Sequence, residues 1–332
     1  MESIRPYNTF KVDHHVSEIY VIESIDQLRT LSKKHVDPII IGGGSNVLFV
    51  KDVERPVFLI DLKGIEIVDE GETWKEVKIA AGEDWHDVVM WSIDQGLGGI
   101  ENLSLIPGKC GAAPMQNIGA YGTELADVLI QVGCMDKQIG ALFNMNKEAC
   151  KLGYRDSVFK HESKDQYVIT SITIRLTKQE YHIVNVSYGD IKHVLDQKGI
   201  TKPTIQDVSD AVIAIRSSKL PNPAQIPNAG SFFKNPIIPL KEFNQLKLNH
   251  QDIPSYPVSQ THCKVPAGWL IDRCGWKGIR IGDVGVHTRQ ALVLVNHGSK
   301  DGQDIVNLSR MIQKKVLDVY NIKLVPEVNM IG

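Results

Sequence analysis

The chain has 332 residues, of which 42% are hydrophobic and 23% charged, which is typical of a globular protein too long for one ordinary core. Its 37 Lys and Arg residues nearly balance 39 Asp and Glu residues, and a formal net charge of -2 gives no reason to expect nucleic acid or an anionic membrane as partner. No apolar run is long enough to span a bilayer, and the first residues lack a signal-peptide pattern. We therefore expect a cytoplasmic protein without membrane insertion.

The cysteines are five in number and lack the paired spacing of metal ligands. An odd number of scattered thiols argues against a disulfide framework, and we interpret them as incidental residues in a reducing compartment. The histidines are scattered as well, so no metal site is predicted. The cysteines are Cys110, Cys134, Cys150, Cys263 and Cys274.

The first two thirds of the chain alternate short apolar runs with few helical patterns. Ser24 is a candidate N-cap for a helix, and Asp84 is a candidate N-cap for another. Mixed strands with few helices favour an α+β fold over a wound parallel sheet. The expected strands are at 19–22, 39–41, 47–50, 65–68, 77–82, 128–132 and 167–174, and the expected helices are at 24–34 and from 84 onward.

The clearest helical pattern covers residues 204–218, with Thr204 as its N-cap and apolar residues at helical spacing. A proline-rich stretch over 221–239 follows and indicates a domain boundary. Beyond it we expect a helix near 240–248, a strand at 291–295 and a terminal helix from Asp304. The apolar face expected for that last helix consists of Ile305, Leu308, Ile312, Val316 and Val319.

Gly42, Gly43 and Gly44 follow the apolar run at 39–41 and precede another at 47–50. A dinucleotide fingerprint of the G-x-G-x-x-G type would need a third glycine where Val47 stands, and a helix where a strand is expected, so the Rossmann interpretation fails. A strand–glycine loop–strand can still bind phosphate through exposed N–H groups. The alternative is a tight hairpin turn.

A second stretch of similar character covers residues 106–122, which are rich in glycine, alanine and proline and nearly uncharged. It has too many glycines for a stable helix, and it can supply little core. What it can do is lie flat against a large ligand with its N–H groups exposed. We predict that the two loops hold one cofactor.

These and three further motifs resemble the UDP-N-acetylenolpyruvoylglucosamine reductase family, in the type with a tyrosine loop. The resemblance extends from Asn8 to Glu327. The motifs that carry it are the glycine loop with Ser45 and Asn46, the segment 111–122, Gly153-Tyr154-Arg155-Asp156-Ser157, residues 228–235, and Pro326-Glu327-Val328. Ser187-Tyr188-Gly189-Asp190 resembles the tyrosine loop.

The resemblance implies non-covalent FAD in a two-subdomain fold of the vanillyl-alcohol-oxidase type, followed by an α+β substrate domain. It predicts FAD-binding subdomains at 1–64 and 65–218, a substrate domain at 219–325 and a segment returning to the active site at 326–332. The implied FAD-binding residues are Gly42, Gly43, Gly44, Ser45, Asn46, Leu48, Ile106, Pro107, Gly111, Ala112, Ala113, Gln116, Asn117, Ile118, Gly119, Tyr121 and Gly122. The implied substrate-binding residues are Tyr154, Tyr188, Lys219, Asn235 and Gln290.

The resemblance also implies the reaction, which is the NADPH-dependent reduction of a UDP-sugar enolpyruvyl ether to UDP-N-acetylmuramate for peptidoglycan. A hydride passes from flavin N5 to the vinyl methylene carbon, and negative charge spreads into the neighbouring carboxylate. Arg155 is expected to stabilise that charge, because its planar cationic fork matches a carboxylate. Ser231 is expected to protonate the adjacent carbon, and Glu327 to polarise the carboxylate or orient a water. The family is commonly monomeric, and its partners are small molecules.

Each catalytic assignment has a structural alternative. Arg155 could form a surface ion pair with Asp156, Ser231 could bond its own turn, and Glu327 could be merely solvated. The chain also departs from many relatives at Asn329, where they have arginine, which leaves the role of Glu327 open. Two rival functions remain: a flavin oxidase or dehydrogenase that acts on an alcohol or sugar, and a sugar-nucleotide binding protein without redox chemistry.

Overall fold

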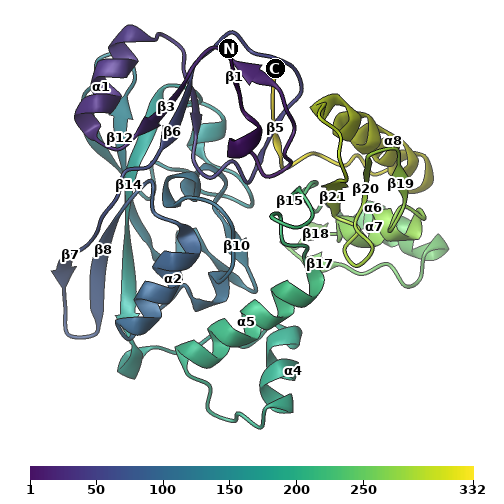
Figure 1. The fold of residues 1–332 in the computed structure, drawn as a ribbon. Coiled ribbons are helices and arrows are strands. Elements are labelled where there is room, and N and C mark those ends of the chain that lie inside the picture. The colour runs from purple at the N-terminus through teal and green to yellow at the C-terminus, as the bar shows by residue number, and fades with distance from the viewer. The chain divides into compact units, whose positions relative to one another are not determined.

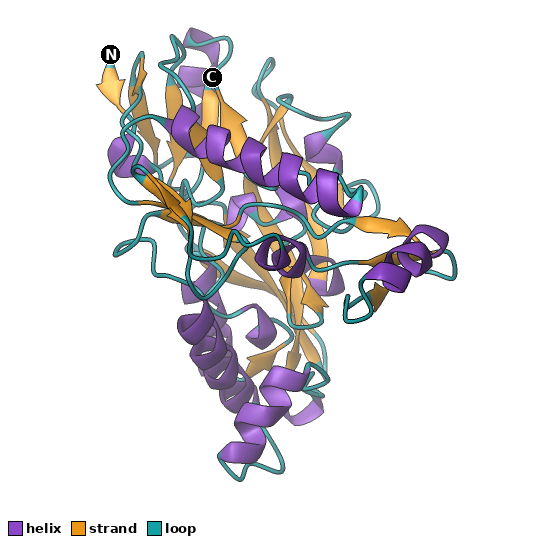
Figure 2. Cartoon of the chain, turned by 90° about the vertical axis from the view of Figure 1, so that its right-hand side faces the viewer, coloured by secondary structure: helices purple, strands orange, loops and turns teal.

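The computed structural model describes all residues from Met1 to Gly332. The chain divides into two compact units. The central unit consists of residues 16–43 and 54–218, and the terminal unit consists of residues 1–15, 44–53 and 219–332. Both mix helices and strands, as Figures 1 and 2 show, which confirms the α+β class. The four-segment division expected from the sequence stays a prediction.

The central unit is built on a 6-stranded antiparallel sheet, in which β14 pairs with β12, β8 and the short β9. Two of the expected strands are longer than their apolar runs, since β12 reaches Asp136 and β14 reaches Lys178. Trp85, Ile79 and Ile172 belong to the main core, which packs on this sheet. In sheet order the strands are β13 (Leu142–Asn146), β12 (Leu129–Asp136), β14 (Tyr167–Lys178), β8 (Trp74–Ala80) and β7 (Ile65–Glu70), with β9 (Leu97–Gly98) beside β14.

A 3-stranded parallel sheet with the order β3-β6-β4 forms the second layer of this unit. It consists of β3 (Ile19–Ile22), β6 (Val57–Ile60) and β4 (Ile39–Ile41). Helix α1 (Ile25–Lys34) follows β3, and its cap is the predicted one, because the Ser24 hydroxyl accepts a hydrogen bond from Gln27 N at 3.2 Å. Leu28 of α1 and Phe58 of β6 are fully buried in one small core.

The prediction that the Asp84 side chain caps the second helix is wrong. Helix α2 (Trp85–Asp94) begins after Asp84, as predicted, but the Asp84 side chain makes no capping hydrogen bond. Its carboxylate accepts instead from Lys109 Nζ at 3.0 Å. A charged ammonium is a stronger partner for a carboxylate than a neutral backbone N–H.

Helices α4 (Gly189–Gln197) and α5 (Ile205–Lys219) pack on each other (Figure 1). The Thr204 cap is confirmed, since its hydroxyl accepts from Asp207 N at 3.2 Å. The apolar face of α5 is confirmed too. It buries Val208, Ala211, Val212 and Ile215 against Ile191 and Leu195 of α4.

Short elements connect the larger ones. They are β1 (Glu2–Ser3), β2 (His15–Val16), β10 (Gly119–Ala120), β11 (Thr123–Glu124), the one-turn helix α3 (Leu125–Val128) and the 3-10 turns Arg5–Tyr7, Glu101–Leu103, Cys110–Ala112, Pro114–Gln116, Val158–Lys160 and Gln179–Tyr181.

The terminal unit contains three small sheets. A 4-stranded sheet has the order β15-β21-β20-β19, a 3-stranded sheet has the order β16-β18-β17, and β22 pairs with β5 in parallel. These strands are β15 (Asn228–Ser231), β21 (Val293–Asn296), β20 (Val284–Val286), β19 (Arg280–Ile281), β16 (Ile237–Pro239), β18 (His262–Lys264), β17 (Tyr256–Pro257), β22 (Asn329–Ile331) and β5 (Val47–Phe49). Its helices are α6 (Leu240–Asn249), α7 (Ala267–Arg273) and α8 (Gly302–Tyr320).

Helix α8 begins at Gly302, earlier than predicted, because the Asp301 carboxylate accepts from Gln303 N at 2.8 Å and caps it. Val319 was expected on its buried face, but it is 41% exposed, and Tyr320 is buried in its place. None of the helices combines the length and the apolar composition that crossing a bilayer requires.

The glycine loop is not a hairpin turn. Strand β4 before it pairs with β6, and strand β5 after it pairs with β22, so the two flanking strands belong to different sheets. The hairpin alternative is therefore wrong, and a strand–loop–strand connection is what the structure contains.

Candidate active site

The first half of the glycine loop lies against the second side-chain-poor loop within the central unit. A Cβ added to Gly43 would approach Gly108 Cα at 3.2 Å, and one added to Gly42 would approach Lys109 Cβ at 3.1 Å. Gly111 N donates to Ala81 O at 2.9 Å, which fixes the second loop at the end of strand β8. The sequence placed these two loops together, and the structure confirms that they touch.

The second half of the glycine loop belongs to the terminal unit. Gly44 has a φ of +62°, and a Cβ there would meet Tyr7 O at 2.0 Å. Its own carbonyl accepts from Thr9 N at 3.2 Å. Both the dihedral angle and the close approach require glycine.

Gly44→Ala is therefore expected to lower the free energy of unfolding by about 2–4 kcal/mol, as strain in the left-handed region adds to the clash. Urea denaturation measures this loss. Gly189→Ala is the matched control, because a Cβ there meets nothing within 4 Å. Equal unfolding midpoints for the two variants would contradict the prediction.

Arg155 occupies a tight turn closed by an antiparallel bridge between Gly153 and Asp156. Its φ is +52°, unusual for a residue with a side chain. Its Nη1 donates to Asn117 O at 3.3 Å and its Nη2 to Gly119 O at 2.5 Å, so the guanidinium lies over the second loop. The guanidinium carbon is 5.7 Å from the centre of the Tyr154 ring, whereas the Asp156 carboxylate contacts His161 at 2.8 Å.

The segments that carry Ser231 and Glu327, far apart in sequence, are paired in the terminal unit. Glu327 N donates to Phe232 O at 2.8 Å, and Phe233 pairs with Pro326. Phe232 and Phe233 are buried, while Ser231 is exposed and Glu327 half-buried. The two buried rings thus anchor a strand that presents the hydroxyl beside the segment with the carboxyl.

The glycine loop joins this pair through Asn46. Asn46 Nδ2 donates to Glu327 O at 3.4 Å, and Asn46 O accepts from both Asn329 N at 3.0 Å and Asn329 Nδ2 at 3.1 Å. Asn329, the departure noted in the sequence, therefore fastens the returning C-terminal segment to the loop.

Tyr188 precedes helix α4 and packs edge-to-face on Tyr121, with ring centroids 5.4 Å apart. Burial raises the pKa of the Tyr121 phenol. Asn102 Nδ2 donates to Tyr121 O at 3.1 Å and to Asn185 O at 2.9 Å, which ties the segment before Tyr188 to the second loop. The sequence analysis missed Asn102 and Asn185, since isolated amides carry no pattern.

The same segment is held by a buried contact between a histidine and a carboxylate. His182 Nε2 contacts Glu101 Oε1 at 2.6 Å, and Gly99 N donates to Glu101 Oε2 at 2.6 Å. Burial raises the pKa of the Glu101 carboxyl, but its hydrogen bonds to His182 and Gly99 and the His182 charge outweigh burial, so the net pKa is lowered.

A lowered folded pKa means that the Glu101 pair adds stability above the ordinary Glu pKa of 4.5 and loses this contribution as pH falls through the lowered value. The difference in unfolding free energy between the wild type and Glu101→Gln should therefore be largest near neutral pH and shrink below about pH 4.5. Urea denaturation at several pH values tests this. The exposed Glu54→Gln is the control, and a pH-independent difference for Glu101→Gln would contradict the prediction.

Arg216 on α5 is a half-buried cation that the sequence analysis also missed. Its Nε is buried and has no hydrogen-bond partner. Burial lowers the pKa of its guanidinium, the Tyr121 phenol raises it, and the nearby Arg155 charge lowers it further. The sequence does contain a signal for it. Val208, Val212 and Arg216 are each four residues apart, so Arg216 lies in line with the apolar face of the helix.

The remaining predicted residues lie in their expected segments. The Asn235 side-chain oxygen Oδ1 accepts from Ala267 N at 2.9 Å, and Gln290 Oε1 accepts from Leu292 N at 3.3 Å. Lys219 is exposed at the end of α5, whereas Leu48 is fully buried in β5. Ile118 is buried, and Ala112 is exposed.

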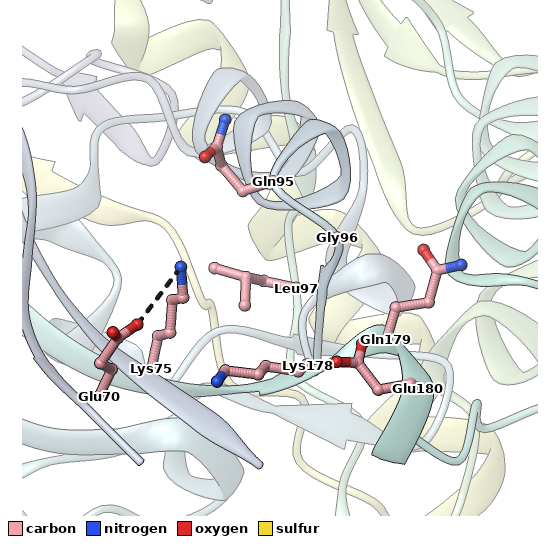
Figure 3. Close-up of a pocket in the computed structure, with 8 residues that line it drawn as sticks. All are labelled: Glu70, Lys75, Gln95, Gly96, Leu97, Lys178, Gln179 and Glu180. Carbon is pink, nitrogen blue, oxygen red and sulfur yellow. Dashed lines mark ion pairs between the residues drawn. The ribbon is translucent and has the colours of Figure 1, made fainter. Parts of the chain in front are cut away.

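A separate surface pocket of about 500 Å³ lies near the β7–β8 hairpin (Figure 3). Glu70 and Lys75 form an ion pair there, at 3.6 Å. It contains none of the residues predicted for the active site. Its lining residues are Glu70, Lys75, Gln95, Gly96, Leu97, Lys178, Gln179 and Glu180.

Comparison with known proteins agrees with this geometry. Residues 22–145 match the family described as "FAD binding domain", and residues 222–331 match "UDP-N-acetylenolpyruvoylglucosamine reductase, C-terminal domain". A UDP-N-acetylenolpyruvoylglucosamine reductase from Flavobacterium johnsoniae is 47% identical over 99% of this chain and 98% of its own length. The chain belongs to the UDP-N-acetylenolpyruvoylglucosamine reductase family. The family, the flavin-binding fold and the reductase activity expected from the sequence are thereby confirmed.

Two more relatives extend the comparison. The reductase of Pseudomonas aeruginosa is 44% identical over 99% of this chain and 97% of its own length. The crystal structure of the reductase from Thermus caldophilus has a TM-score of 0.69 at 22% identity, and the match covers 100% of this chain and 98% of that one. The latter likeness concerns the fold alone.

The structure has two features that fit FAD. The first is the pair of touching loops, which are poor in side chains and meet at Gly43, where a Cβ would lie 3.2 Å from Gly108 Cα. The second is Arg216, a half-buried cation whose Nε is buried and lacks a protein partner. A cation with a buried nitrogen needs an anionic or carbonyl-rich group to compensate its desolvation. FAD contains both kinds of group, since its diphosphate is anionic and its isoalloxazine ring carries carbonyls.

Proposed function

We propose that this chain reduces the enolpyruvyl group of UDP-N-acetylglucosamine enolpyruvate to give UDP-N-acetylmuramate, with FAD as cofactor and NADPH as reductant. The reaction is the one its family carries out, and Arg155, Ser231 and Glu327 act on the reacting group. The observation that supports this assignment is the backbone hydrogen bond from Glu327 N to Phe232 O at 2.8 Å, which pairs the segment that carries Glu327 with the residue next to Ser231.

The touching loops and Arg216 would hold the cofactor. Bound FAD would supply the two-electron redox chemistry between NADPH and the substrate. The backbone at Gly42 is a candidate for its polar groups, and Arg216 is a candidate for a carbonyl-rich or anionic part. Gly111 N and Ala112 N already donate to Ala81 O and Lys109 O, so these two residues would contact the cofactor through other atoms. Sequence-based assignments for Ser45, Asn46 and Gln116 stay part of this proposal.

Arg155 would bind the substrate carboxylate and stabilise the charge that spreads into it. Its guanidinium stays cationic at any working pH and offers paired N–H groups, so it binds an enolate more tightly than the neutral vinyl group. Two of its nitrogens already donate to loop carbonyls, which fixes the plane of the fork before substrate arrives.

Ser231 would deliver the proton. A serine hydroxyl is a weak acid, so it can act only toward a strongly basic carbon within hydrogen-bond reach. The exposed position of Ser231 at the end of β15 leaves the hydroxyl accessible. Glu327 would polarise the carboxylate or orient a water, and Asn329 fastens its segment to the glycine loop.

The sugar nucleotide would be recognised by residues from several segments. Tyr188, Lys219 and Asn235 are proposed for its diphosphate, and Tyr154 and Gln290 for further contacts. We also propose a cytoplasmic monomer that works on small molecules, because NADPH and nucleotide sugars are cytoplasmic metabolites and no other partner is needed for this chemistry.

Anaerobic stopped-flow measurement of the purified protein tests the proposal. NADPH should bleach the flavin absorbance, and the enolpyruvyl sugar nucleotide should restore it. Reduction by NADPH followed by no reoxidation with this substrate would overturn the proposal in favour of a flavin dehydrogenase acting on an alcohol or sugar. A colourless protein that takes up no FAD would leave only a binding function.

A further inference from the structure

The turn that carries Arg155 is strained and must be held from outside. Arg155 has a φ of +52°, and this left-handed region is unfavourable for a residue with a side chain. The turn has a bridge at its base, between Gly153 and Asp156, but that bridge alone does not fix how the turn lies on its neighbours.

Asn117 holds the first end of this turn. Its Nδ2 donates to Gly153 O at 3.1 Å and to Glu124 Oε2 at 2.8 Å, while its Oδ1 accepts from Ala126 N at 2.9 Å. Both amide N–H groups are thus committed inside the protein. Asn117 is 1% exposed and itself has a φ of +43°.

The contact is reciprocal, because the backbone carbonyl of Asn117 accepts from Arg155 Nη1 at 3.3 Å. Ser157 holds the other end of the turn: it is 1% exposed, and its hydroxyl donates to Met115 O at 2.7 Å. Lys160 Nζ donates to Arg155 O at 3.1 Å. The turn is therefore fastened on both sides to one short segment of the second loop.

We propose that Asn117, assisted by Ser157, is a positioning residue that sets the direction of the Arg155 guanidinium for the reaction. The sequence analysis predicted that Asn117 binds the cofactor. Its side-chain amide is instead hydrogen-bonded within the protein, which supports a role that acts through Arg155. This inference rests on the proposed function of Arg155. Misplacing a substrate-orienting group by about 1 Å can cost on the order of 100-fold in rate.

A double-mutant cycle tests the inference. Asn117→Gly removes the amide while tolerating the left-handed backbone, and Ser157→Ala removes the second fastener from an extended residue. Each should slow reoxidation of reduced flavin by the enolpyruvyl sugar nucleotide about 10- to 100-fold, with reduction by NADPH unchanged. Adding Asn117→Gly to Arg155→Ala should cause no further loss, because the effect passes through Arg155.

The matched control is Asp165→Gly, which changes another left-handed residue, at φ +59°, in an exposed loop. Flavin content and thermal midpoint identify variants that fail to fold. If Asn117→Gly fails to fold, the reoxidation rate of Ser157→Ala tests the inference. Reoxidation at the wild-type rate in both single variants overturns the inference. It is also overturned if the double variant Asn117→Gly with Arg155→Ala reoxidises more slowly than Arg155→Ala alone. Equal slowing of the NADPH step also overturns it, and indicates a cofactor contact. If Arg155→Ala itself reoxidises normally, the proposed function fails first.

Discussion

Ser231→Ala should leave reduction of the flavin by NADPH unchanged and slow its reoxidation by the enolpyruvyl sugar nucleotide by about four orders of magnitude or more. This is the upper end of what a positioned general acid contributes, and no other hydroxyl in β15 could replace it. Because Ser231 is exposed, removing its hydroxyl leaves no buried polar group unsatisfied, and the fold should be unaffected.

Anaerobic stopped-flow separates the two steps, and Ser259→Ala, an exposed serine of the same unit, is the control. If the second step of Ser231→Ala runs within a few-fold of the wild type, the proton comes from another group. Glu327→Gln then becomes the next variant to test, since its segment is the one paired with Phe232.

Arg155→Ala should retain FAD and lose about 1,000-fold in the same reoxidation step, because the charge developing on the substrate carboxylate loses its cation. Arg155→Lys should recover only part of this loss. Lysine keeps the charge, but it offers a point charge in place of the planar fork, and it cannot make both of the contacts to Asn117 O and Gly119 O in the same geometry.

The measurement is again the rate of each half-reaction, with Arg310→Ala on the exposed side of α8 as the control. A variant that purifies without flavin and unfolds at low urea would assign Arg155 a structural role. Full recovery in Arg155→Lys would mean that charge alone matters and that the fork geometry does not.

Two corrections concern competition between local and tertiary partners. Asp84 stands where a helix cap is expected, but Lys109, distant in sequence, takes its carboxylate. Val319 fits the apolar row of α8, but the helix ends at Tyr320, and its last turn buries that residue in place of Val319. Local propensity suggests a role for each side chain. Contacts formed in the folded chain determine which partner it has and whether it is buried.

The sequence by itself determined the elements with strong local signals: the Ser24 and Thr204 caps, the apolar face of α5, and the two loops poor in side chains. Their causes lie within a few residues of each other, in hydrogen bonds and periodic burial. Only the tertiary structure decided that Gly43 touches Gly108, that Glu327 pairs with Phe232 beside Ser231, and that Arg216 has a buried Nε without a partner. These depend on contacts between distant segments, whose register no local pattern encodes.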